Sequence, residues 1–184
     1  MKNYLFSILF LAGTAATAQI QTEYYSTGKK RCEGAYVPSS GSGTKVIMAS
    51  DGSSRPDPSQ TKTGNWTYWY EAGTKSAEES YAAGNSTGVW KTWYPDGTQS
   101  SEINYTAGTA VFWFPNGNKQ SEGGILQNRV FNGSWTAWYD NGVKSYDGNY
   151  KNGKKDGDWK WYDTSGKQTL VENYSQDVLK DSKK

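Results

Sequence analysis

Five acidic residues recur at one position of a repeated sequence unit and are the obvious candidates for acid–base chemistry. They are Glu33, Glu78, Glu102, Glu122 and Asp147. Two carboxylates divide into a general acid and a general base only when their environments differ. These five recur in equivalent surroundings, with lysines nearby in most of the same segments. The spacing therefore predicts a structural ladder and not a catalytic pair.

The 184-residue sequence contains no histidine and a single cysteine, Cys32. The lack of histidine excludes Ser-His and Cys-His dyads and metal sites built on imidazole. A Ser-Lys or all-carboxylate site stays open, but no motif locates one. Cys32 has no intramolecular partner, so no disulfide can stabilise the fold. We expect no enzymatic activity, no cofactor and no bound metal.

Aromatic residues are the more informative set, with 9 Trp, 14 Tyr and 5 Phe in the chain. Their spacing follows a series of glycines, each preceded by a short polar turn: Gly28, Gly52, Gly73, Gly97, Gly117, Gly142 and Gly166. Four residues before most of these glycines stand Tyr24, Trp69, Trp93, Trp113, Trp138 and Tyr162. Seven residues before four of them stand Trp66, Trp90, Trp135 and Trp159. This internal periodicity predicts a repeat architecture.

Each repeat has the sequence features of a β-hairpin. Asp-Gly and Asn-Gly before the second strand favour tight turns, because glycine adopts positive φ without steric cost. The aromatic-rich run before the turn and the Lys-x-x-Glu-x-x-Tyr run after it are typical of strands. The sequence thus predicts an all-β protein, an elongated single antiparallel sheet of about seven tandem hairpins, each roughly 23 residues long.

Two segments depart from the repeat pattern. The first lies within the expected repeat domain, residues 19–174, and the second follows that domain. Residues 37–63 are rich in Gly, Ser and Pro, and Met48 and Ala49 replace the aromatic pair, so we interpret them as a degenerate repeat and the weakest hairpin. Residues 175–184 form a charged C-terminal tail. We expect this tail to be disordered or to form a short capping helix.

Alternation along a strand places the two aromatic series on opposite faces. Trp66, Trp90, Trp135 and Trp159 belong to a dense aromatic face, whereas Trp69, Trp93, Trp113 and Trp138 form a sparser stripe with polar neighbours. Both series, together with Gly73, Gly97, Gly117 and Gly142, are expected to hold neighbouring hairpins together. The second interpretation is that the sparser stripe is partly exposed and contacts a partner.

The Gly-x-Trp-x-x-aromatic-aromatic-x-x-Gly unit resembles the bacterial MORN-repeat variant family, which includes YwqK-like proteins of the antitoxin type. The resemblance covers roughly residues 21–174. It implies an antiparallel sheet of serial hairpins that serves as a scaffold or binding surface. It implies a protein partner, and an antitoxin or immunity-like role in particular.

The amino terminus has the features of a secretory signal peptide, residues 1–18. Lys2 is followed by a short apolar run and by Ala16-Thr17-Ala18, which predicts cleavage after Ala18. Thr14 stands where a lipoprotein signal would carry its cysteine, so we expect no lipid. No segment reaches the ~20 apolar residues that a membrane-spanning helix needs. We expect a secreted or periplasmic protein without a transmembrane segment.

The near balance of 20 basic and 18 acidic residues argues against nucleic acid as a partner. The sequence therefore favours an exported, non-enzymatic scaffold for protein–protein binding. The alternative is carbohydrate or cell-wall binding, because Trp-Tyr-rich hairpins are also similar to choline- and glucan-binding repeats. The openings and second strands of those repeats align poorly with this unit. A hydrolase carried on the sheet is a further alternative.

Overall fold

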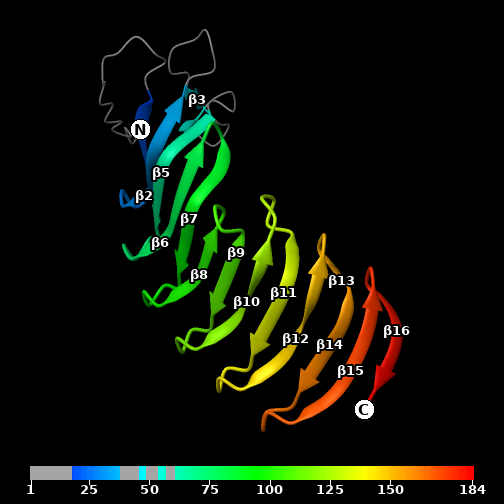
Figure 1. Ribbon diagram of the computed structural model, residues 1–184. Coiled ribbons are helices and arrows are strands. Elements are labelled where there is room, and N and C mark those ends of the chain that lie inside the picture. Colours follow the sequence, from blue (N-terminus) through cyan, green and yellow to red (C-terminus); the bar gives the residue numbers. More distant parts are fainter. Residues whose placement is uncertain (1–17, 38–45, 49–53, 57–60) are drawn as a thin grey trace. The chain divides into compact units, whose positions relative to one another are not determined.

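The computed structural model describes residues 18–37, 46–48, 54–56 and 61–184, and the account below concerns these residues (Figure 1). They form an all-β structure in which no residue is helical. One open antiparallel sheet contains 14 strands, and the strands follow one another in sequence order. The predicted fold class, serial hairpins in one antiparallel sheet, is confirmed.

The chain divides into two compact units, Met1–Thr87 and Gly88–Lys184. The strands whose bounds lie in the first unit are β1 (Gln19–Tyr24), β2 (Lys30–Val37), β3 (Val46–Met48), β4 (Ser54–Pro56), β5 (Thr61–Trp69) and β6 (Lys75–Ala82). β1 pairs with β2, β2 with β5 and β5 with β6, all antiparallel. The first unit is thus built around two hairpins of the large sheet.

The second unit repeats the same hairpin four times. β7 (Asn85–Trp93) begins before the division and continues into this unit. The strands that follow are β8 (Gln99–Asn104), β9 (Thr109–Trp113), β10 (Lys119–Ile125), β11 (Phe131–Trp138), β12 (Lys144–Lys151), β13 (Lys154–Lys155), β14 (Gly157–Tyr162), β15 (Gln168–Ser175) and β16 (Val178–Lys183).

The turn inside each hairpin explains the regular glycines. At the β11–β12 turn, the Gly142 amide donates to the Tyr139 carbonyl at 2.9 Å, and the Tyr139 amide donates to the Val143 carbonyl at 2.8 Å. Gly142 has a φ of 83°, the left-handed conformation that other residues adopt at a steric cost. This is a tight turn closed by a glycine bulge. The same two bonds recur around Gly28, Gly73, Gly97, Gly117 and Gly166.

The two strands inside the degenerate repeat, β3 and β4, are not part of the large sheet. Of its described residues, only those at its ends, Val37 and residues 61–63, lie in strands of that sheet. β3 and β4 pair only with each other, and β2 pairs directly with β5. The degenerate hairpin, one of the seven expected, is therefore a separate two-stranded sheet. Its predicted turn glycine, Gly52, lies outside the described residues. Pro56 at the end of β4 has no amide hydrogen to donate to a ladder, which fits its place outside a central pairing.

The carboxyl-terminal tail is a strand, and the expectation of disorder or a capping helix was wrong. β16 pairs with β15, with Ser175 opposite Val178 across a two-residue turn. Gln176 and Asp177 in this turn have φ of 52° and 69°. Positive φ at both central residues is characteristic of a type I′ turn, whose twist matches that of the paired strands. The edge of β15 offers backbone donors and acceptors, and the tail satisfies them despite its charge.

Candidate binding surface

Four tryptophans, Trp66, Trp90, Trp135 and Trp159, define one face of the sheet in each unit, which we call the tryptophan face. Trp159 is only 1% exposed although no second layer of described structure covers the sheet. Its indole lies against Gly148 on the preceding strand, where a Cβ would overlap the ring. Its Nε1 donates to the Asn149 carbonyl at 3.2 Å. The hairpin that contains Trp159 is thereby anchored on the backbone of the neighbouring hairpin.

The same contact recurs in two other places. Trp135 lies against Gly123 and donates to the Gly124 carbonyl at 2.8 Å. Trp66 lies against Gly34 and donates to the Ala35 carbonyl at 3.2 Å. The turn periodicity alone does not single out these glycines, because the residue six positions after the turn glycine is glycine in only three of the repeats. Their pairing with a later Gly-x-Trp was the available signal.

One hairpin pair replaces this contact by a complementary one. Ile103 of β8 occupies the position of Gly34, Gly123 and Gly148, and it is paired with Ala110 of β9, where β5, β7, β11 and β14 carry tryptophan. Ile103 is 8% exposed and Ala110 is 1% exposed, so the larger and smaller side chains exchange places in the packed layer. The layer stays densely packed, although here the larger side chain is on β8 and the smaller one is on β9.

Tyrosine rings in or directly after the second strand of several hairpins complete the tryptophan face. Tyr150 meets Trp159 edge to face, with ring centroids 4.8 Å apart, and Tyr36 meets Trp66 in the same way at 4.7 Å. Trp90 and Tyr105 are 5.1 Å apart in a third T-shaped pair. Such pairs add about 0.5–1.5 kcal/mol beyond the area that they bury. The aromatic residues thus take the place of an aliphatic core.

The opposite face carries the predicted stripe, Trp69, Trp93, Trp113 and Trp138, and we call it the stripe face. All four side chains are half-buried. Lys30 Nζ lies 5.1 Å from the Trp69 ring centroid, and Lys119 Nζ lies 5.4 Å from the Trp138 ring centroid. β8 carries Gln99 at the corresponding position before Trp113. The stripe is therefore made of partly exposed rings, some of them covered by lysine ammonium groups.

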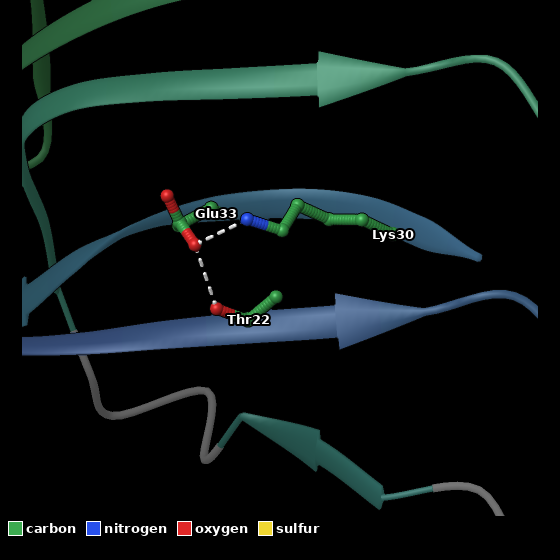
Figure 2. A network of polar contacts seen from close by, with 3 residues as sticks. All are labelled: Thr22, Lys30 and Glu33. Carbon is green, nitrogen blue, oxygen red and sulfur yellow. Dashed lines mark hydrogen bonds and ion pairs between the residues drawn. The ribbon is translucent and has the colours of Figure 1, made fainter. Parts of the chain in front are cut away.

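The acidic column lies on the stripe face as a series of ion pairs. Lys30 Nζ lies 2.7 Å from Glu33 Oε2, which also accepts a hydrogen bond from Thr22 Oγ1 at 3.0 Å (Figure 2). The hydrogen bond from Lys30 holds the pKa of Glu33 below its usual range. Similar ion pairs are Lys75–Glu78, Lys119–Glu122 at 2.7 Å, Lys144–Asp147 at 3.0 Å and Lys91–Glu102 at 3.4 Å. Four of the five carboxylates pair with the lysine three residues earlier, and Glu102 pairs with Lys91 on the neighbouring strand, so each has an ammonium partner.

Tyrosines at the turns connect neighbouring hairpins. Tyr139 Oη donates to the Tyr162 carbonyl at 2.7 Å, and Tyr94 Oη donates to the Trp113 carbonyl at 2.8 Å. Where Phe114 has no hydroxyl, the side chains of Asn116 and Asn118 donate instead to the Asp140 carbonyl, at 2.9 and 2.7 Å. The sequence predicted an aromatic column here but not this link between turns, because its partner is a backbone carbonyl.

Cys32 belongs to the packed layer of the first unit. It is 5% exposed and lies in one cluster with Tyr36 and Trp66. Burial, reinforced by the neighbouring Glu23 carboxylate, raises the pKa of the Cys32 thiol to about 12. Within the described part of the chain, no group of three or more His, Cys, Asp or Glu residues could hold a metal ion.

Some of the hairpins that make these contacts match a known repeat family. Three segments match the MORN repeat variant. They are residues 86–107, 131–152 and 155–174. The first covers the β7–β8 hairpin from Ser86, the second β11–β12, and the third runs from Lys155 to Tyr174. A comparison with curated proteins gave no match. The match supports a repeat scaffold of the kind that often binds partners.

Among the described residues, no helix is long and apolar enough to cross a membrane.

Proposed function

We propose that this chain is an exported, non-enzymatic repeat scaffold that binds a protein partner through the stripe face. The observation that carries the proposal is the recurrence of a half-exposed ring on alternate strands of the second unit, at Trp93, Trp113 and Trp138. Large aromatic residues dominate protein-binding hot spots, because they bury much area at little entropic cost. An antitoxin or immunity-like role is the form of partner binding that we favour.

The spacing of the rings suits an extended ligand. Strands pair at about 4.8 Å, so rings on every second strand stand roughly 10 Å apart. Between the rings and beside them lie the ion pairs, among them Lys119–Glu122 and Lys144–Asp147. Charges of both signs in a regular row favour specificity over long-range attraction. A protein surface can match such a row of rings and charges along its whole length.

Export is supported by the position of the first strand. β1 begins at Gln19, the first residue after the predicted cleavage site, and Ala18 is exposed. Cleavage would therefore remove no described residue of the large sheet. The single buried thiol also suits an oxidising compartment, since it has no partner within the chain and is shielded from solvent.

A glycan or cell-wall ligand is the second candidate. The observation that favours it is the same row of half-exposed indoles, since sugar rings stack on aromatic faces as readily as protein side chains pack against them. Ion pairs between the rings favour the protein partner, because a neutral glycan gives them nothing to complement. Binding to peptidoglycan or glucan beads separates the two candidates.

The test uses the mature chain, residues 19–184, as bait in the extracellular and periplasmic fractions of its own source. A Trp113→Ser and Trp138→Ser double variant should lose at least tenfold in partner capture while its circular dichroism stays that of the parent. Leu126→Ser is the matched control, because Leu126 is 39% exposed and lies in a turn outside the stripe. Equal capture by the double variant and the parent would remove the stripe as the site, and retention on glycan beads alone would favour the second candidate.

A further inference from the structure

Two clusters on the tryptophan face share one pattern at the same spacing: a lysine, a tryptophan, a second aromatic residue, a glutamate and a tyrosine. The first is Lys62, Trp66, Tyr68, Glu79 and Tyr81, and the second is Lys155, Trp159, Trp161, Glu172 and Tyr174. The first lies within the first unit and the second within the second unit. In both, an ammonium group is surrounded by three aromatic rings and one carboxylate stands behind them. We call each of them a cation cage.

The geometry of the second cage is that of a receptor for a cation. Lys155 Nζ lies 4.6 Å from the Trp159 ring centroid, 4.8 Å from that of Trp161 and 4.7 Å from that of Tyr174. In the first cage the distances from Lys62 Nζ to Trp66, Tyr68 and Tyr81 are 4.6, 5.1 and 5.0 Å. A cation within about 6 Å of several ring faces is attracted by each of them.

The carboxylate fixes the rings, and in the first cage the Lys62 ammonium also donates a hydrogen bond to Tyr68 Oη at 2.5 Å. Glu172 Oε2 accepts hydrogen bonds from Trp161 Nε1 at 2.8 Å and from Tyr174 Oη at 2.9 Å. Glu79 Oε2 accepts one from Tyr81 Oη at 2.7 Å. Rings held in this way are preorganised, so a ligand need not order them on binding. In the described part of the chain, the Lys155 ammonium takes part in no salt bridge.

A third ring site shows that such rings accept a cation from another hairpin. The Arg129 guanidinium carbon lies 4.7 Å from the Trp90 ring centroid, and Arg129 Nε donates to Tyr105 Oη at 2.6 Å. Ser86 stands four residues before Trp90, where the cages have their lysine, so this strand supplies no cation of its own. The turn between β10 and β11 supplies one instead. At this ring site the positive charge therefore comes from another segment of the chain.

We propose that the two cation cages are binding sites for a quaternary ammonium ligand, a small molecule of the choline type, which enters by displacing the resident lysine ammonium. A primary ammonium is strongly hydrated and is stabilised in water when it leaves the rings. A quaternary ammonium has no hydrogen to donate to water and keeps its full charge, so aromatic cages favour it. Both Lys62 and Lys155 are partly exposed, so each side chain has a path to solvent.

The resident lysine sets the affinity of the intact protein. A tethered group competes at an effective concentration of the order of millimolar or above. The parent should therefore bind the ligand weakly, and removal of the lysine should raise the apparent affinity about tenfold or more, because the empty cage becomes the main state. The proposal concerns the tryptophan face and does not depend on partner binding at the stripe face.

The experiment is a titration of the mature chain with choline chloride, followed by tryptophan fluorescence and calorimetry at constant ionic strength. Lys155→Ala and Lys62→Ala should each bind choline about tenfold more tightly than the parent does. Lys154→Ala is the matched control, since Lys154 is the exposed neighbour of Lys155 and should leave the affinity unchanged. Dimethylbutanol, the neutral isostere of choline, should not bind, because the attraction requires the charge.

A second measurement on the parent protein covers the case in which a variant fails to fold. Ring currents should shift the ε-methylene resonances of Lys62 and Lys155 upfield, and saturating choline should return them to ordinary lysine positions as the side chains leave the cages. Shifts that stay in place at saturating choline, with no calorimetric binding, would overturn the proposal. So would equal binding of choline and dimethylbutanol, which would mean an apolar pocket and not a cation site.

Discussion

The indole of Trp159 lies against the backbone of Gly148 on the adjacent strand, in the space that a Cβ would occupy, and donates a hydrogen bond to the next carbonyl. In the β8–β9 pair, Ile103 and Ala110 divide the same space in the opposite way. The two arrangements are alternative solutions for one packed layer. Exchanging one for the other tests whether that layer determines stability.

Gly148→Ile should destabilise the protein by roughly 1–3 kcal/mol through overpacking, and Trp159→Ala by about 3–5 kcal/mol through loss of a buried ring. The double variant imitates the Ile103 and Ala110 arrangement. Its loss of unfolding free energy should therefore be smaller than the sum of the two single losses by more than about 0.5 kcal/mol. Urea unfolding measures all three. Gly148→Ile combined with Trp90→Ala should be additive, and strict additivity in both pairs would contradict the packing account.

The two faces should respond differently to loss of a ring. Trp135 is 2% exposed, so Trp135→Ala should cost about 3–5 kcal/mol. Trp138 is half-buried beneath Lys119, so Trp138→Ala should cost about 1–2 kcal/mol, from a cation–π contact and partial burial. Thermal and urea unfolding compare the two variants. Equal large losses would show that the stripe is a structural element and would weaken its assignment to binding.

The hydroxyl of Tyr139 links two turns, and its loss should have a modest effect. Tyr139→Phe removes the bond to the Tyr162 carbonyl and should cost about 0.5–1.5 kcal/mol. Tyr24→Phe is the control, because Tyr24 is 37% exposed at the end of β1. Hydrogen exchange should localise the change to the β11–β12 and β14–β15 turns. Uniform loss of protection over the second unit would mean that the bond does more than link these turns.

Alkaline pH should destabilise the first unit. Burial raises the pKa of the Cys32 thiol from 9.0 to about 12, and burial also raises the pKa of Tyr36 and of Tyr68. The folded state thus holds these protons more tightly than the unfolded state does. The contribution is complete below pH 9.0 and is lost as the pH rises towards about 12. Urea midpoints should fall in this range, and Cys32→Ala should make the fall shallower; a stability that rises there would contradict the assignment.

Export predicts a defined mature protein. Cleavage after Ala18 leaves Gln19 as the amino terminus and β1 intact. The intact mass of material from the culture medium or periplasm should correspond to residues 19–184 without added lipid. A species that retains Met1, or a mass increased by an acyl chain, would contradict the predicted signal.

The sequence by itself determined the hairpins. Gly142 and its equivalents fix tight turns through their own φ, and the Lys-x-x-Glu spacing fixes the ion pairs within one strand. Both are local properties, so each is readable from a few consecutive residues. The alternation of Trp66 and Trp69 between two faces follows from the period of a strand for the same reason.

Only the tertiary structure decided how the hairpins meet. That β2 pairs with β5, that the 175–184 tail adds β16, and that Trp159 rests on Gly148 all depend on a neighbouring strand. The cation cages depend on it too, because their rings come from two strands and their lysine from the start of the hairpin. Such contacts arise from the shape of the assembled layer, where the space left by one residue determines which side chain of the next hairpin can fill it.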